Sequence, residues 1–176
     1  MVVMTAKLSK KKLLGIAAAI VIGGWQEMLA GNLTHLYIFG FALVFGLIGF
    51  IDDFQKVVHH RNTGLTASQK FILQLAAAIA FLCLMRYIGV LTPNLYIPFF
   101  HTSIVLPWIV YLIFAAFVIV GTVNAVNITD GVDGLASTVT LPVGAFFTVI
   151  AVLWANRSVG IFAAALLGGL LGFLLY

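Results

Sequence analysis

Charge and cysteine are the two things this chain has least of. Only 8% of its 176 residues are charged, while 63% are hydrophobic. Soluble domains usually have about a quarter of their residues charged, so this composition excludes an ordinary soluble globular domain. The single cysteine, Cys83, excludes an internal disulfide framework. The small net charge of +4 gives no reason to expect a nucleic-acid partner.

Long apolar runs take up most of the chain. A membrane-spanning helix needs about 20 apolar residues, and six runs reach or approach that length. They cover residues 13–30, 36–51, 71–91, 108–126, 135–154 and 159–176. The pattern predicts an all-α fold, a single integral membrane domain over residues 1–176 with about six transmembrane helices. The second run is short and can extend at either end.

The segment between the third and fourth runs has a different composition. Residues 92–107 hold three of the four prolines, Pro93, Pro98 and Pro107, and two short apolar stretches. Proline cannot continue a helix or a central strand, so this segment is predicted to be a hairpin or loop on the outer face. Aromatic residues such as Phe99 and Phe100 suit the membrane–water interface there.

The basic residues predict the orientation of the helices. Seven of the nine Lys and Arg residues precede the first run or lie between the second and third. These seven are Lys7, Lys10, Lys11, Lys12, Lys56, Arg61 and Lys70. Loops rich in Lys and Arg face the cytoplasm, so both termini and both of the acidic clusters described next are predicted to be cytoplasmic.

Four of the five acidic residues form two clusters beside apolar runs. In the first, Asp52 and Asp53 follow the second run. A helix C-terminus disfavours anions, and adjacent carboxylates repel each other. One explanation is a solvated turn helped by Lys56. The other is that a cation or a reacting phosphate removes the conflict.

The second cluster, Asp130 and Asp133, lies in the stretch Asn124–Gly134. Capping of the next helix could explain both aspartates. It does not explain Asn124 and Asn127, which share one helix face if the helix persists. Amides, carboxylates and glycines beside a helix N-terminus favour a site for a phosphorylated, hydroxyl-rich ligand.

Three motifs together resemble one enzyme family. They are Gly49–Val58 (GFIDDFQKVV), Arg61–Lys70 (RNTGLTASQK) and Asn124–Ala136 (NAVNITDGVDGLA). The Asp-Asp pair and the Asn-x-x-Asp-Gly-x-Asp-Gly pattern resemble the polyprenyl-phosphate N-acetylhexosamine-1-phosphate transferase superfamily. The complete strings are similar to its phospho-N-acetylmuramoyl-pentapeptide transferase family.

The resemblance implies a reaction at the cytoplasmic face of the bacterial inner membrane. Phospho-N-acetylmuramoyl-pentapeptide passes from its UDP donor to undecaprenyl phosphate, giving lipid I and UMP, with Mg²⁺. The transfer belongs to peptidoglycan synthesis, and thus to cell-wall biogenesis, cell shape and cell division. The nearest alternative is a transferase of N-acetylglucosamine 1-phosphate. A membrane binding module without turnover also stays open, whereas an ion transporter would need polar groups at mid-membrane.

The resemblance also implies roles for particular residues. Asp52 is expected to accept the lipid phosphate's proton or to position that phosphate, with Asp53 in support. The substrate-binding residues are expected to be Lys56, Lys70, Asn124, Asn127, Asp130, Gly131 and Asp133. Asp130 and Asp133 are the expected metal ligands.

The chain departs from the family pattern at both ends. Its six runs match the second to seventh of about ten family spans, and the family's Thr-Pro-Thr-Met-Gly-Gly motif is missing near Met1. The family's principal magnesium aspartate would lie beyond Tyr176. We expect a fragment, a truncated gene model or a degenerate copy, inactive in isolation, and full activity would refute this. The spacing of Gly168, Gly169 and Gly172 favours close helix packing and gives weak support to a homodimer.

Overall fold

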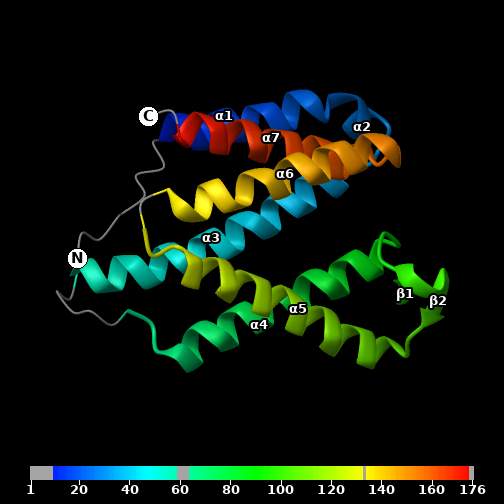
Figure 1. Ribbon diagram of the computed structural model, residues 1–176, viewed down its shortest axis with the longest axis horizontal. Coiled ribbons are helices and arrows are strands. Elements are labelled where there is room, and N and C mark those ends of the chain that lie inside the picture. The colour runs from blue at the N-terminus through cyan, green and yellow to red at the C-terminus, as the bar shows by residue number, and fades with distance from the viewer. Residues whose placement is uncertain (1–9, 59–63, 133, 175–176) are drawn as a thin grey trace. The chain divides into compact units, whose positions relative to one another are not determined.

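The computed structural model describes residues 10–58, 64–132 and 134–174. Over these residues the chain folds into seven α-helices and one β-hairpin (Figure 1). The helices are α1 (Lys10–Gly23), α2 (Trp25–Leu29), α3 (Thr34–Val58), α4 (Ala67–Tyr87), α5 (Trp108–Thr129), α6 (Leu135–Leu153) and α7 (Arg157–Leu174). The prediction of an all-α polytopic membrane protein is confirmed.

Five of these helices, α3 to α7, are long and apolar enough to cross a membrane. They correspond to the second to sixth predicted spans. The second span extends at both ends, because α3 runs from Thr34 to Val58 rather than over residues 36–51 alone. Its C-terminal extension carries Asp52, Asp53 and Lys56 as part of the helix.

The first predicted span, residues 13–30, is not one continuous helix. It consists of α1 and the short α2, separated at Gly24. Gly24 lies directly against the fully buried imidazole of His35, and a Cβ at this position would overlap the ring. Close packing of His35 therefore requires glycine at the break. His35 is one of the few polar side chains that are buried in the described residues.

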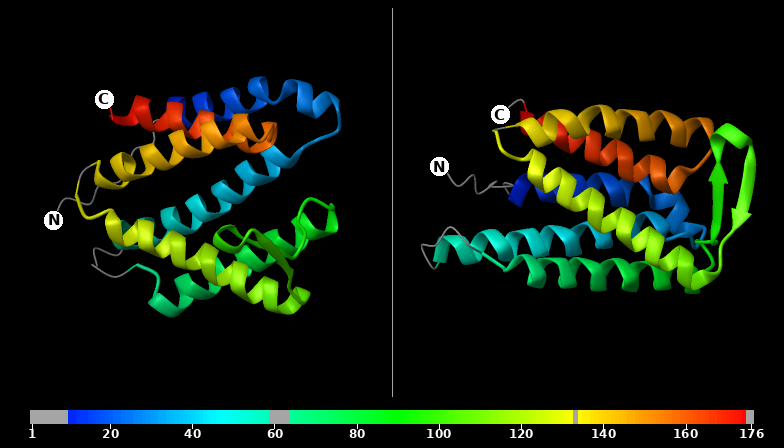
Figure 2. Two further views of the ribbon diagram at one scale, coloured as in Figure 1. Left: turned by 45° about the vertical axis from the view of Figure 1, so that its right-hand side comes forward. Right: turned by 60° about the horizontal axis from the view of Figure 1, so that its bottom comes forward.

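Residues 92–107 form the predicted hairpin. Strand β1 (Asn94–Ile97) pairs antiparallel with β2 (Thr102–Val105), and the short 3₁₀ turn η1 (Pro98–Phe100) joins them. The hairpin connects α4 to α5 (Figure 2). Phe99 and Phe100 at its tip are 92% and 78% exposed. Their position at the membrane interface stays a prediction.

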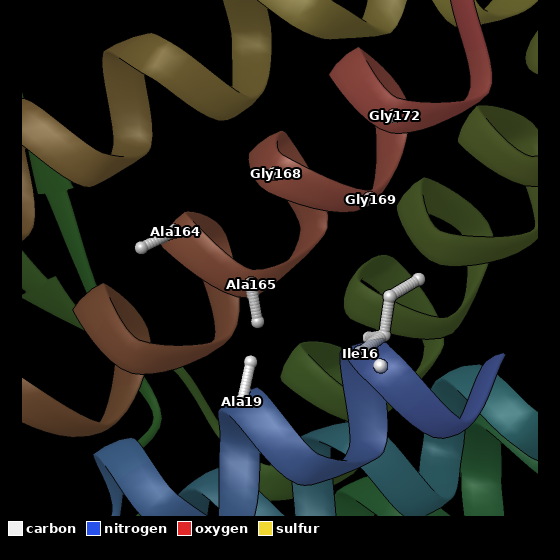
Figure 3. A pocket seen from close by; sticks show the side chains of 8 residues that line it. Ile16, Ala19, Ala164, Ala165, Gly168, Gly169 and Gly172 are labelled. Carbon is white, nitrogen blue, oxygen red and sulfur yellow. The ribbon is translucent and has the colours of Figure 1, made fainter. Parts of the chain in front are cut away.

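The chain divides into two compact units, residues 1–42 with 126–176 and residues 43–125. In the first unit α7 packs against both α6 and α1. Gly169 of α7 faces α1 closely, since a Cβ there would lie 2.5 Å from Cδ1 of Ile16. Small residues line a hollow of about 410 Å³ between these two helices (Figure 3). The close packing predicted for these glycines is thus seen at Gly169, whereas a Cβ at Gly168 or Gly172 would meet nothing within 4 Å.

The second unit holds α4, the hairpin and most of α5. Its buried apolar core joins Ala78 and Leu82 of α4 to Ala116 and Val120 of α5. These side-chain contacts hold α4 against α5. Gln74 of α4 and Asn124 of α5 lie in the halves of the two helices that are away from the hairpin, and they are hydrogen-bonded to each other.

Candidate functional site

Asp52 is a buried carboxylate in a helix of membrane-spanning length. It lies in the last two turns of α3, and only 6% of its surface is exposed. A carboxylate that loses water must gain hydrogen bonds or opposite charge in return. Asp52 has both, so its burial is compensated by the surrounding chain.

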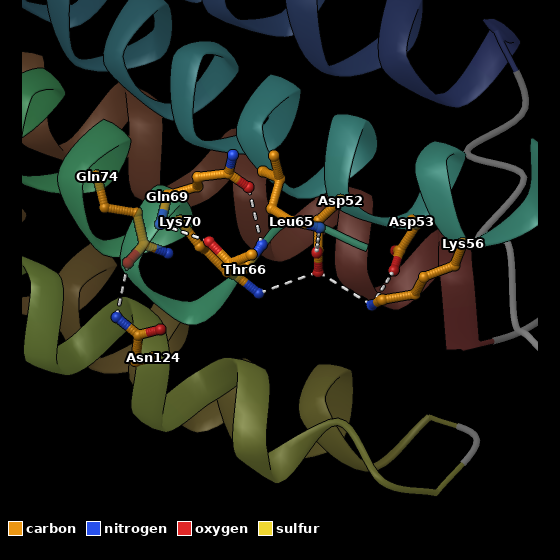
Figure 4. Close-up of polar contacts among 9 residues, drawn as sticks. All are labelled: Asp52, Asp53, Lys56, Leu65, Thr66, Gln69, Lys70, Gln74 and Asn124. Atoms are coloured by element: carbon orange, nitrogen blue, oxygen red, sulfur yellow. Dashed lines mark hydrogen bonds and ion pairs between the residues drawn. The ribbon is translucent and has the colours of Figure 1, made fainter. Parts of the chain in front are cut away.

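Two lysines from different helices supply the positive charge. The Nζ atom of Lys56 lies 3.0 Å from Oδ2 of Asp52, and the Nζ atom of Lys70 lies 3.3 Å from the same oxygen. Lys56 is one helical turn further along α3, whereas Lys70 lies in the first turn of α4. Figure 4 shows the Asp52 carboxylate between the two ammonium groups.

The chain that leads into α4 completes the cluster. The backbone N–H of Leu65 donates to Oδ1 of Asp52 at 2.9 Å. Gly64 passes so close to Asp52 that a Cβ would overlap both its carboxylate and its backbone oxygen. Thr66 then caps α4, exchanging hydrogen bonds with Gln69 in a capping box. This arrangement places Lys70 within one turn of the helix start.

Asp53 has a different environment from its neighbour. Its side chain is 53% exposed, and Oδ1 accepts a hydrogen bond of 3.0 Å from Nζ of Lys56. The predicted conflict between two adjacent carboxylates is therefore relieved by lysines. Both lysines were predicted to contact substrate phosphate, and that role stays a prediction.

Asn124 is held by a residue that the sequence analysis did not single out. Its Nδ2 atom donates to Oε1 of Gln74 at 2.7 Å and to the carbonyl oxygen of Val120 at 2.8 Å. Gln74 is only 2% exposed and lies one turn after Lys70 on α4. A glutamine within an apolar run was the available signal, because a buried amide needs a partner.

The remaining predicted residues belong to the other unit. Helix α5 persists to Thr129, and Asn127 and Asp130 are both exposed. The N-cap of α6 is Gly134, with a φ of 79° and no side-chain cap. Asp130 is therefore not the N-cap of α6, so capping does not explain this aspartate. Asp133 lies outside the described residues.

The described residues contain no group of three His, Cys, Asp or Glu side chains that could hold a metal ion. Mg²⁺ is usually bound through one or two carboxylates, with waters and substrate phosphates filling the other positions. The exposed carboxylate of Asp130 suits that kind of binding. Asp52 suits it less, because both of its oxygens are already hydrogen-bonded.

Comparison with known proteins identifies similar sequences throughout this region. The phospho-N-acetylmuramoyl-pentapeptide-transferase of Clostridium acetobutylicum is 42% identical over 149 residues, which is 82% of this chain and 46% of the relative. That of Thermoanaerobacter sp. strain X514 is 45% identical over 162 residues, 92% of this chain and 48% of the relative. That of Listeria innocua serovar 6a is 46% identical over 133 residues, 76% of this chain and 40% of the relative.

The chain spans about half the length of the curated relatives it matches. The sequence profile described as glycosyl transferase family 4 matches residues 35–176, which include α3 from its second residue and every later element to α7. This chain therefore belongs to glycosyl transferase family 4.

Proposed function

We propose that the protein acts in the transfer of phospho-N-acetylmuramoyl-pentapeptide from UDP to undecaprenyl phosphate, giving lipid I and UMP. The relatives that support this carry the name of that activity and are 42% and 45% identical to this chain. Because the chain spans about half of their length, the activity of the whole protein is a proposal here.

One observation carries the chemical assignment, the buried Asp52 carboxylate held by Lys56 and Lys70 at the end of a membrane-spanning helix. A lipid phosphate is anchored by its tail, so its head group meets the protein at such a helix end. An ammonium group has three donors, so a lysine bound to a carboxylate can also bind a phosphate oxygen. We assign the acceptor phosphate to this cluster.

Asp52 then has a defined task. The acceptor phosphate oxygen attacks the donor's sugar-linked phosphorus, and UMP leaves. Positioning and electrostatic stabilisation account for most of the catalysis in phosphoryl transfer. Asp52 accepts a proton from the lipid phosphate or positions it through the lysines, and Asp53 supports Lys56 through its 3.0 Å contact.

We assign the nucleotide sugar to the segment from Asn124 to Asp133. Asn127, Asp130 and Gly131 are exposed there, so a soluble ligand can reach them. Asp130 and Asp133 are the proposed ligands of Mg²⁺, which when bound neutralises diphosphate charge. The polar composition of this segment supports the assignment.

The proposed location is the bacterial inner membrane, with both clusters at the cytoplasmic face. The positive-inside rule supports this orientation, because Lys56 and Lys70 lie in the same connection as Asp52. A homodimer is a further proposal, supported only by the spacing of Gly168, Gly169 and Gly172.

Equilibrium binding tests the donor assignment. The chain in lipid nanodiscs is titrated with UDP-N-acetylmuramoyl-pentapeptide and Mg²⁺, beside Asp130→Asn and an Asp53→Asn control. We expect Asp130→Asn to weaken binding by roughly tenfold or more, since a charge-assisted contact is lost. Unchanged affinity in Asp130→Asn would contradict the assignment. Equal displacement by UDP-N-acetylglucosamine would favour the alternative donor.

A further inference from the structure

Gln74 and Asn124 form a buried amide pair between α4 and α5. Their side chains are joined at 2.7 Å although they are 50 positions apart in the chain. Figure 4 shows the pair beside the Asp52 cluster, with Gln74 one turn after Lys70 on the same helix. Of the two partners, only Asn124 belongs to the motif that we assign to the nucleotide sugar.

The surroundings determine which way the Asn124 amide points. The oxygen and nitrogen of an amide are assigned from their hydrogen-bond partners. Here the Val120 carbonyl oxygen, 2.8 Å away, can only accept a hydrogen bond, so the group facing it must be Nδ2. The Gln74 atom at 2.7 Å from that nitrogen must then be the acceptor Oε1.

Both N–H groups of Asn124 are consumed by these two bonds. A primary amide has two N–H donors and one oxygen with two lone pairs. With one N–H on Gln74 and the other on Val120, only the carbonyl oxygen of Asn124 is left for a ligand. An oxygen of that kind can accept from a hydroxyl or an N–H, or contact a cation. It cannot donate to a phosphate oxygen.

We propose that Gln74 is a positioning residue that makes Asn124 an acceptor-only contact for the nucleotide sugar. This inference rests on the proposed function, and it deepens it by specifying the contact. Asn124 meets a hydroxyl or amide N–H of the donor, and the phosphates are bound elsewhere. Without Oε1 of Gln74, one N–H of Asn124 would be unsatisfied and the amide could rotate out of position.

A purely structural role for Gln74 makes a different prediction. Hydrogen bonds between membrane helices stabilise helix association only modestly. If Gln74 only holds α4 to α5, its replacement lowers the stability of the chain and leaves the affinity of folded protein unchanged. The two roles therefore separate in a binding measurement on folded variants.

The experiment compares two replacements of Gln74 in the full chain in nanodiscs, using the affinity for UDP-N-acetylmuramoyl-pentapeptide as the readout. Gln74→Met has nearly the same shape but no acceptor, and we expect it to weaken binding roughly tenfold. Gln74→Glu keeps an acceptor oxygen at the same reach, and we expect affinity within about threefold of wild type. Gln74→Asn withdraws the oxygen by one methylene and replaces Gln74→Met if that variant does not fold.

Ser158→Ala is the matched control. Ser158 is also buried, at 5% exposure, and its hydroxyl accepts a hydrogen bond of 3.1 Å from Asn32. Its loss should change the unfolding midpoint and leave nucleotide-sugar affinity unchanged. Wild-type affinity in Gln74→Met, or equal weakening in Gln74→Glu and Gln74→Met, overturns the inference while the proposed function stands. Absence of binding by the wild-type chain overturns both.

Discussion

Asp52 shows how one charged residue is accommodated at a membrane boundary. Its neighbours in sequence suggested a conflict, because a helix end and a second carboxylate both oppose its charge. Lys56 could be anticipated as a partner, since it lies one turn away on the same helix. Lys70 could not, because its 3.3 Å contact depends on the path of the intervening chain. The motif and the Asp52–Lys56 pair could be predicted from sequence, but the pair of Asp52 with Lys70 could not.

Replacement of Lys70 tests whether the buried carboxylate depends on it. Lys70→Met leaves Asp52 with less compensating charge, and we expect the free energy of unfolding to fall by about 1–3 kcal/mol. Reversible unfolding in micelles, followed by circular dichroism, measures the change. Arg157→Met is the control, because the Arg157 side chain is 69% exposed and lies 3.7 Å from Glu27. Its effect should stay below about 1 kcal/mol, and an equal effect in both variants would contradict the account.

Gly131, in the proposed nucleotide-sugar segment, and Gly134, directly after it, are expected to respond differently to replacement by alanine. Gly134 has a φ of 79°, so Gly134→Ala should destabilise the chain by about 1–2 kcal/mol. A Cβ added at Gly131 would meet only open space, so Gly131→Ala should leave stability within about 0.5 kcal/mol. If the ligand approaches Gly131 closely, the same variant weakens nucleotide-sugar binding. Thermal unfolding and titration of each variant separate these effects, and a destabilised Gly131→Ala would contradict the structure.

At the scale of elements, five of the six apolar runs correspond to single helices of spanning length. The first run, residues 13–30, is divided between α1 and α2. Composition marks where a helix can lie in a membrane, but it does not report where that helix is interrupted. Gly24 separates α1 from α2 and lies against the buried ring of His35, which follows α2 in the chain. The hairpin was predictable because its three prolines excluded a long helix between α4 and α5.

The contact between Gly24 and His35 should be sensitive to a single methyl group. Gly24→Ala places a Cβ within the space of the imidazole, and overpacking of this kind costs about 1–3 kcal/mol. We expect a lower unfolding midpoint in micelles. The double variant Gly24→Ala with His35→Ala should regain part of the loss, because the clash is removed. A wild-type midpoint in the single variant would contradict this packing.

The adjacent glycines of α7 offer a matched pair for the contact with α1. Gly169→Ala would place a Cβ 2.5 Å from Cδ1 of Ile16, whereas a Cβ at Gly168 meets nothing within 4 Å. We expect Gly169→Ala to destabilise the chain by about 1–3 kcal/mol and Gly168→Ala to have little effect. Unfolding of both variants in the same micelles measures the difference. Equal midpoints would show that α1 does not pack on this face of α7.

At the scale of the whole molecule, the chain has two features that suit its two proposed substrates. Five helices of spanning length suit a lipid acceptor, and polar motifs between them suit a soluble nucleotide donor. The sequence predicted both because membrane spans and motif residues are local properties of the chain. It could not predict the division into two compact units or the Gln74 contact, which depend on which helices pack together.

The central claim is that the two substrates use two separately replaceable sets of residues. The most direct test is a paired titration of the chain in nanodiscs with undecaprenyl phosphate and with UDP-N-acetylmuramoyl-pentapeptide, comparing Lys70→Met with Asp130→Asn. Lys70→Met should weaken lipid-phosphate binding roughly tenfold and spare the nucleotide sugar, and Asp130→Asn should do the reverse. If both variants weaken the same substrate, or neither weakens either, the assignment of the two sites is wrong.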